Sequence, residues 1–80
     1  MKLYEVGDRM VYDMLLSSIG IGCRRNDLSG KALAARVAIP ERTYRERVEH
    51  PETFRLGEIC AIARQVGMKV TFTVEDDYYG

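Results

Sequence analysis

The two prolines of the chain, Pro40 and Pro51, most constrain what it can fold into. A proline inside a helix removes a backbone donor and clashes with the preceding turn. Pro40 therefore stops the helix that the sequence predicts over residues 30–37, which Ser29 is placed to cap. Proline suits the first turn of a new helix, where its missing N–H costs nothing. We expect that new helix to start at Pro40 or Glu41 and to end at Pro51.

Apolar periodicity predicts two further helices. One runs from about Asp8 to Ser18 and ends near Gly20 and Gly22, where the backbone relaxes. "CRRNDLSG" then reads as a polar loop. The other covers residues 56–66, with Gly67 as its C-terminal cap. The expected inward faces are Met10, Val11, Met14, Leu15 and Ser18 in the first helix, and Leu56, Ile59, Cys60, Ala63 and Val66 in the second.

The last part of the chain alternates in the manner of a strand. Val70, Phe72 and Val74 alternate with polar residues, which predicts a β-strand over about 69–75. "KLYEV" near the start is a possible short partner strand. The expected fold is thus mainly α, with four to five helices and a C-terminal β-strand in one domain over 1–80.

Length and composition exclude several classes of protein. Of the 80 residues, 46% are hydrophobic and 30% charged, which is typical of a globular chain rather than a disordered one. No apolar run approaches the ~20 residues that span a bilayer, so no membrane partner is expected. The opening residues lack a basic-then-apolar signal, and a cytoplasmic protein is expected. Cys23, Cys60 and His50 have no metal-ligand spacing, and we find no nucleophile–base pair or phosphate loop. We therefore expect no cofactor, no metal and no enzyme.

The charge is unevenly distributed, although its total is zero. Residues 24–50 carry seven Lys or Arg against four acidic side chains, a net of +3, whereas 1–23 carry −1 and 51–80 carry −2. A local basic region can bind phosphate in a chain that is neutral as a whole.

Two short helices joined by a tight turn, the second rich in arginine, suggest a helix-turn-helix over about 30–50. The stretch "SGKALAARVAIPERTYRERVEHPETFRLGEICAIARQVGM" resembles the Cro/C1-type (XRE, lambda repressor-like) DNA-binding family. Within it, "LAARVAI" resembles the family's second helix and turn, "TYRERVEHP" its recognition helix, and "LGEICAIARQVGM" the helix that follows recognition. The resemblance covers about half of the chain and implies a lambda repressor-like fold in a small regulator from a phage, a mobile element or a bacterial chromosome.

The sequence departs from that family's pattern at two positions. Ala38 stands where glycine is usual in the turn, so we expect either that the turn differs slightly from the family's or that Ala38 bears ~1 kcal/mol of strain at a positive φ. Arg55 stands where a threonine cap is usual, and Arg55 cannot complete a capping box with Glu58. We expect Thr53 to cap that helix instead.

The resemblance implies a role for each exposed residue around the two helices. Arginine donates to guanine and glutamate accepts from cytosine in the major groove, whereas helix N-termini and outer cations bind phosphate. Tyr44 and Val48 belong to the core. The expected base contacts are Glu41, Arg42, Arg45 and Glu46, and the expected phosphate contacts are Arg24, Arg25, Ser29, Gly30, Lys31, Thr43 and Arg47.

Three alternatives stay open at this point. The charges can form a plain solvated face, with i,i+4 pairs Arg42–Glu46 and Arg45–Glu49. A helix with no net charge binds DNA weakly, so we expect a homodimer. The two copies would pair through the edge of the predicted C-terminal strand, at Val70, Phe72 and Val74, unless this strand folds onto its own domain. Finally, an antitoxin-like or adaptor module on the same fold would bind a protein partner rather than double-stranded DNA.

Overall fold

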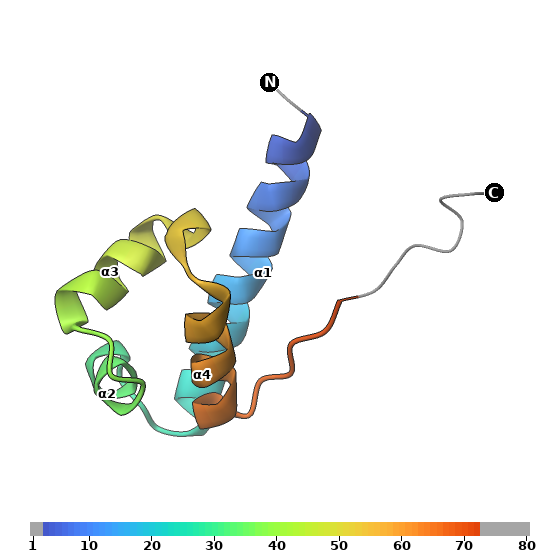
Figure 1. The fold of residues 1–80 in the computed structure, drawn as a ribbon. Coiled ribbons are helices and arrows are strands. Elements are labelled where there is room, and N and C mark those ends of the chain that lie inside the picture. The colour runs from blue at the N-terminus through green and yellow to red at the C-terminus, as the bar shows by residue number, and fades with distance from the viewer. Residues whose placement is uncertain (1–2, 73–80) are drawn as a thin grey trace.

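The protein is mainly α-helical in its computed structural model, which describes the backbone of residues 3–72 and the side chains of 9–72. Figure 1 shows a long first helix whose C-terminal half lies beside the last helix, with two shorter helices next to them. The elements are α1 (Leu3–Arg25), α2 (Gly30–Arg36), α3 (Glu41–Glu49), the short 3₁₀ turn η1 (Pro51–Thr53) and α4 (Leu56–Val66).

Helix α1 is much longer than the sequence suggested. It continues through Gly20 and Gly22 to Arg25, so the expected end near the glycines was wrong. Glycine in a helix interior costs only about 0.5–1 kcal/mol, and here one glycine serves packing. A Cβ on Gly22 would lie 2.6 Å from Val66 Cβ. Residues 3–6 belong to α1, so the proposed "KLYEV" strand was also wrong.

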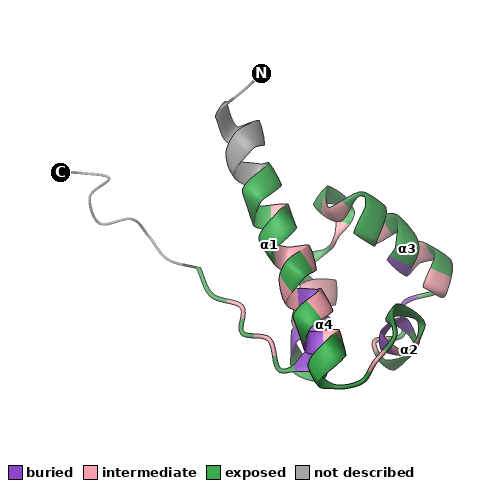
Figure 2. Cartoon of the chain, turned by 180° about the vertical axis from the view of Figure 1, so that it is seen from behind, coloured by how far each residue is buried: buried purple, intermediate pink, exposed green. Residues whose placement is uncertain are grey.

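The inward face of α1 also differs from the expected one. Ile19 is buried, and Leu15 and Cys23 pack against the core on the same side, at i, i+4 and i+8. Met10, Val11 and Met14 are instead exposed, on the half of α1 that projects beyond the other helices (Figure 2). The helix carries apolar residues on more than one face, and the prediction from periodicity chose a face that is largely exposed to solvent.

The turn between α2 and α3 holds Ala38 in a left-handed backbone conformation. Ala38 has φ of 58°, in the left-handed region, as expected for a position where glycine is usual. The Ile39 N–H donates to Ala34 O at 2.9 Å and the Ala38 N–H to Ala35 O at 3.3 Å. These two bonds make a Schellman motif, which satisfies the last carbonyls of α2 and redirects the chain into α3.

Helix α4 has the expected bounds, and Gly67 follows it in the left-handed region at φ of 72°. The expected Thr53 cap was wrong, because Thr53 Oγ1 donates to His50 O at 2.6 Å. At the start of α4 the Arg55 N–H donates to Glu58 Oε1 at 2.9 Å, and the Arg55 side chain has no acceptor with which to return the bond. Leu56 and Val48 are exposed rather than in the core, since each lies at a helix end.

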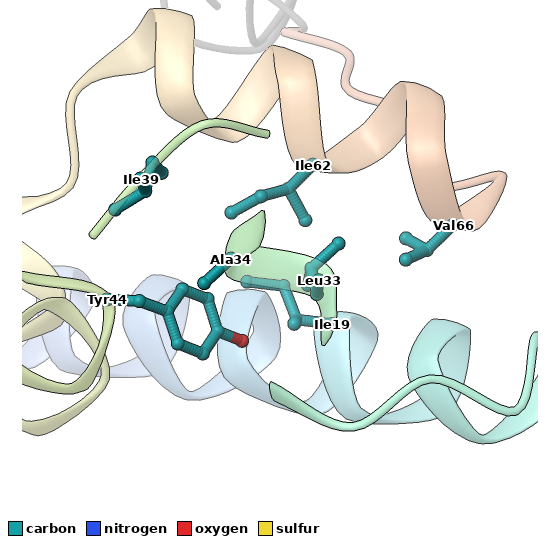
Figure 3. Close-up of a cluster of buried hydrophobic side chains, with 7 residues drawn as sticks. All are labelled: Ile19, Leu33, Ala34, Ile39, Tyr44, Ile62 and Val66. Carbon is teal, nitrogen blue, oxygen red and sulfur yellow. The ribbon is translucent and has the colours of Figure 1, made fainter. Parts of the chain in front are cut away.

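One core joins all four helices. Tyr44 from α3 and Ile39 from the turn pack against residues of α1, α2 and α4 (Figure 3). Leu33 and Ile62 are its fully buried centre. The complete cluster is Ile19, Leu33, Ala34, Ile39, Tyr44, Ile62 and Val66.

The structure describes residues 69–72 of the predicted C-terminal strand, and no strand is formed there. Residues 69–72 have no regular secondary structure, and Phe72 is 83% exposed. The rest of the predicted strand, with Val74, lies outside the described residues. Among the helices of residues 3–72, none has the length and apolar character needed to cross a membrane.

Candidate nucleic-acid interface

Helix α3 is held in place by its one buried side chain, Tyr44. The Tyr44 ring packs toward the start of α2, where a Cβ on Gly30 would lie 3.2 Å from Tyr44 Cε2. Glycine at position 30 therefore lets the ring approach the backbone closely. Gly30 was expected to contact phosphate, and the structure gives it a packing role that the sequence did not reveal.

The opposite side of α3 faces solvent. The Arg42 and Arg45 side chains are 93% and 75% exposed, whereas Tyr44 is only 7% exposed. The expectation that the guanidinium groups point outward while the phenol ring is buried is thus confirmed. Glu46 is exposed and Glu41 half-buried on the same helix. All four expected base-contact residues therefore lie on α3, and three of them are exposed.

Each arginine on this face has a glutamate partner within α3. Arg42 Nε lies 3.6 Å from Glu46 Oε1, as expected, and Arg45 Nη2 lies 2.8 Å from Glu41 Oε1. The expected Arg45–Glu49 pair is not the one formed. Exposed i,i+4 pairs contribute only about 0.3–0.5 kcal/mol. A stronger hydrogen-bonding ligand can therefore replace either carboxylate at little cost.

Arg47, expected to contact phosphate, is engaged inside the protein. Its Nε donates to Glu58 Oε1 at 3.0 Å, and the two side chains are 17% and 18% exposed. Desolvation alone would raise the pKa of Glu58, but bonds from the Arg55 N–H and the Arg47 guanidinium outweigh it and hold the pKa below its ordinary value. The ion pair fastens α3 to α4 and orients the helix that carries Arg42 and Arg45.

The remaining expected phosphate contacts, apart from Thr43, lie at the two ends of the α1–α2 loop. Ser29 caps α2 as expected, since its Oγ accepts the Ala32 N–H at 3.1 Å. Lys31 is exposed in the first turn of α2, whereas Thr43 is half-buried in α3. Arg24 and Arg25 are exposed in the last turn of α1 rather than in the loop, because the helix runs further than expected.

Four further residues were not identified as functional from the sequence. Asn26 donates from Nδ2 to Gly22 O at 2.8 Å and to Val66 O at 3.2 Å, which joins the C-terminal ends of α1 and α4. Arg36, Arg64 and Lys69 are exposed cations. The signal for these three was available, because none has an acidic residue three or four positions away.

The cysteines and the buried tyrosine offer no second site in the described residues. Cys23 and Cys60 are free and half-buried. Burial raises the pKa of the Cys23 thiol, and burial together with the nearby Cys23 raises the pKa of Tyr44. Residues 9–72 hold no group of three His, Cys, Asp or Glu side chains arranged to bind a metal ion.

No protein-family model matches the chain, and comparison with curated proteins and with solved structures gives no match either.

Proposed function

We propose that the protein is a small transcriptional regulator that binds double-stranded DNA at specific sequences, with α3 in the major groove. In this proposal α2 and α3 form a helix-turn-helix in a lambda repressor-like fold, as the sequence resemblance implies, and the protein acts in the cytoplasm of a bacterium that carries a phage or mobile element. The observation that carries the proposal is the orientation of α3. Tyr44 anchors one side of the helix while Arg42 and Arg45 extend from the other.

The exposed side chains of α3 suit base edges in the major groove. Arg42 and Arg45 can each donate two bonds to O6 and N7 of guanine, and Glu46 can accept from N4 of cytosine. Each good pairing discriminates against the wrong base by about 1–3 kcal/mol. Because this gain exceeds the ~0.3–0.5 kcal/mol of an exposed i,i+4 ion pair, it is favourable for the two arginines to exchange their glutamate partners for bases of the DNA.

A dimer is the second part of the proposal. Residues 41–49 carry three arginines and three glutamates, so α3 by itself adds little electrostatic attraction to phosphate. Two copies on one site bind far more tightly than one, and a two-fold dimer places its recognition helices about 34 Å apart on the duplex. We propose that pairing uses the segment of Val70, Phe72 and Val74; the exposed Phe72 ring supports this.

One observation favours a second function. Met10, Val11 and Met14 form an exposed apolar surface on the projecting half of α1, and exposed apolar surface of this kind is typical of protein interaction sites. An adaptor or antitoxin-like module on this fold would bind a protein through α1 and leave α3 free of DNA.

A selection from random-sequence duplexes tests the first function against the second. We expect the wild-type protein to enrich one sequence whose guanines pair with Arg42 and Arg45. Arg42→Ala and Arg45→Ala should relax the preference at separate positions and leave thermal stability unchanged, because neither side chain packs in the core. Arg55→Ala, an exposed arginine outside α3, is the matched control. Enrichment of no sequence by the wild-type protein would contradict DNA binding and favour a protein partner.

A further inference from the structure

We propose that a basic surface at one end of the molecule, distinct from α3, binds the phosphate backbone of the duplex beside the bases that α3 reads. This inference rests on the proposed function and says where its electrostatic attraction comes from. The surface, called the basic end below, consists of Arg24, Arg25, Lys31, Arg36, Arg64 and Lys69, all exposed.

Contacts between three helices bring together the segments that carry these residues. The Asn26 amide bonds to carbonyls of both α1 and α4, at Gly22 and Val66, so the last turns of the two helices meet. Arg24 and Arg25 lie in the last turn of α1, and Arg64 lies in that of α4. Helix α2 packs against both α3 and α4. Figure 1 shows α2 and the loop before it beside the ends of α1 and α4.

Among the described residues, the segments that form the basic end contain a single carboxylate. Its six cations have one acidic neighbour in the segments 24–36 and 64–72, Asp27. All three ion pairs formed among the described side chains lie elsewhere, on α3 and at the start of α4. Residues 41–58, which include α3, carry four arginines against five glutamates. The positive charge of the central part of the chain therefore lies beside α3 and not on it.

This division of charge separates two tasks that a DNA-binding protein must perform. Phosphate contacts supply affinity without reading sequence, and base contacts supply specificity. Helix α3, neutral and outward-facing, suits the second task. The basic end suits the first, and α2 connects the two surfaces physically.

Some of these cations also have a possible role in stability that is independent of DNA. A helix C-terminus has a partial negative charge, which Arg24, Arg25 and Arg64 would offset in α1 and α4. That role predicts a loss of stability when they are neutralised and no effect on DNA binding. It does not apply to Lys31, in the first turn of α2, or to Lys69, beyond α4.

The test measures how DNA affinity depends on salt. Binding of a labelled duplex carrying the selected sequence, and of a scrambled duplex, is followed by fluorescence anisotropy over a range of sodium chloride concentrations. Each lost phosphate contact makes the log–log slope shallower by about 1, so Arg64→Gln/Lys69→Gln should reduce it by about 2. The ratio of affinities for the two duplexes should not change. Arg9→Gln/Arg55→Gln, two exposed arginines outside the basic end, should keep the wild-type slope.

Two outcomes would overturn the inference, and they differ from failure of the proposed function. If the wild-type protein binds and Arg64→Gln/Lys69→Gln keeps its slope, the basic end does not contact phosphate. If the double variant instead changes the ratio of the two affinities, the basic end contributes to sequence recognition, and the proposed division of tasks between it and α3 is wrong. Absence of any wild-type binding would remove the proposed function and this inference with it. Should Arg64→Gln/Lys69→Gln fail to fold, Lys31→Gln/Lys69→Gln tests the same surface without touching a helix C-terminus.

Discussion

Gly22 of α1 packs directly against Val66 of α4. A Cβ built on Gly22 would lie 2.6 Å from both Cβ and Cγ2 of Val66, and Gly22 is buried. The Asn26 amide, which donates to the carbonyls of these same two residues, fixes the crossing from the end. Ile19 and Ile62, from the same two helices, belong to one buried core cluster.

The first prediction compares two glycines of one helix. Gly22→Ala should lower the free energy of unfolding by about 1–3 kcal/mol, because the added methyl group overpacks a tight contact. Gly20→Ala should raise it by about 0.5–1 kcal/mol, since a Cβ there meets only the end of the Arg24 side chain at 3.5 Å. Urea unfolding followed by circular dichroism measures both. Similar effects of the two substitutions would show that α1 and α4 do not cross at Gly22.

Ala38 gives the second prediction. L-residues pay about 1–2 kcal/mol in the left-handed region, and Ala38 has φ of 58°. Ala38→Gly should remove that strain and, after the extra entropy of the unfolded chain is subtracted, stabilise the protein by about 1 kcal/mol. Ala35→Gly, in the helical part of α2, is the matched control and should destabilise by a similar amount. A loss of stability in both variants would mean that the turn does not hold Ala38 in this conformation.

Much of the fold could be predicted where the sequence signals were local. Ser29, Pro40 and Gly67 mark helix ends by backbone chemistry, and α2, α3 and α4 begin and end where these residues imply. Helix α1 was mispredicted because its glycines signal a break when read locally. The packing role of Gly22 depends on Val66, 44 positions away, which no local pattern contains.

In the candidate site too, features set by local sequence could be predicted, and features that depend on contacts between helices could not. The outward direction of Arg42 and Arg45 followed from helical periodicity and from the burial of Tyr44. The engagement of Arg47 did not, because its partner Glu58 belongs to the next helix. Gly30 was assigned to phosphate from its place at the start of α2. Its contact with the Tyr44 ring could not be predicted, because it arises only when α2 and α3 pack together.

The Arg47–Glu58 pair predicts how stability depends on pH. The pKa of Glu58 is lowered in the folded protein, so near and below the ordinary glutamate value of about 4.3 the unfolded chain binds more protons there. The contribution is complete above that value and is lost as the pH falls through the folded pKa. Wild-type stability should therefore fall more steeply below about pH 4.3 than that of Glu58→Gln, as measured by urea unfolding at a series of pH values.

A control separates this pair from the general effect of acid. Glu52→Gln removes an exposed carboxylate that takes part in none of the three ion pairs among the described side chains. It should keep the wild-type slope of stability against pH. Parallel curves for wild type and Glu58→Gln would contradict a stabilising bond between Arg47 and Glu58.

The last prediction concerns how two copies associate. If pairing uses the segment around Phe72, whose ring is 83% exposed, Phe72→Glu removes an apolar side chain worth about 1.5–3 kcal/mol on burial. The dimer dissociation constant from sedimentation equilibrium should then rise by roughly ten- to a hundredfold. Met14→Glu places the same charge on the exposed face of α1 and should leave the constant unchanged. The reverse result, with Met14→Glu alone dissociating the dimer, would move the interface to α1 and away from the C-terminal segment.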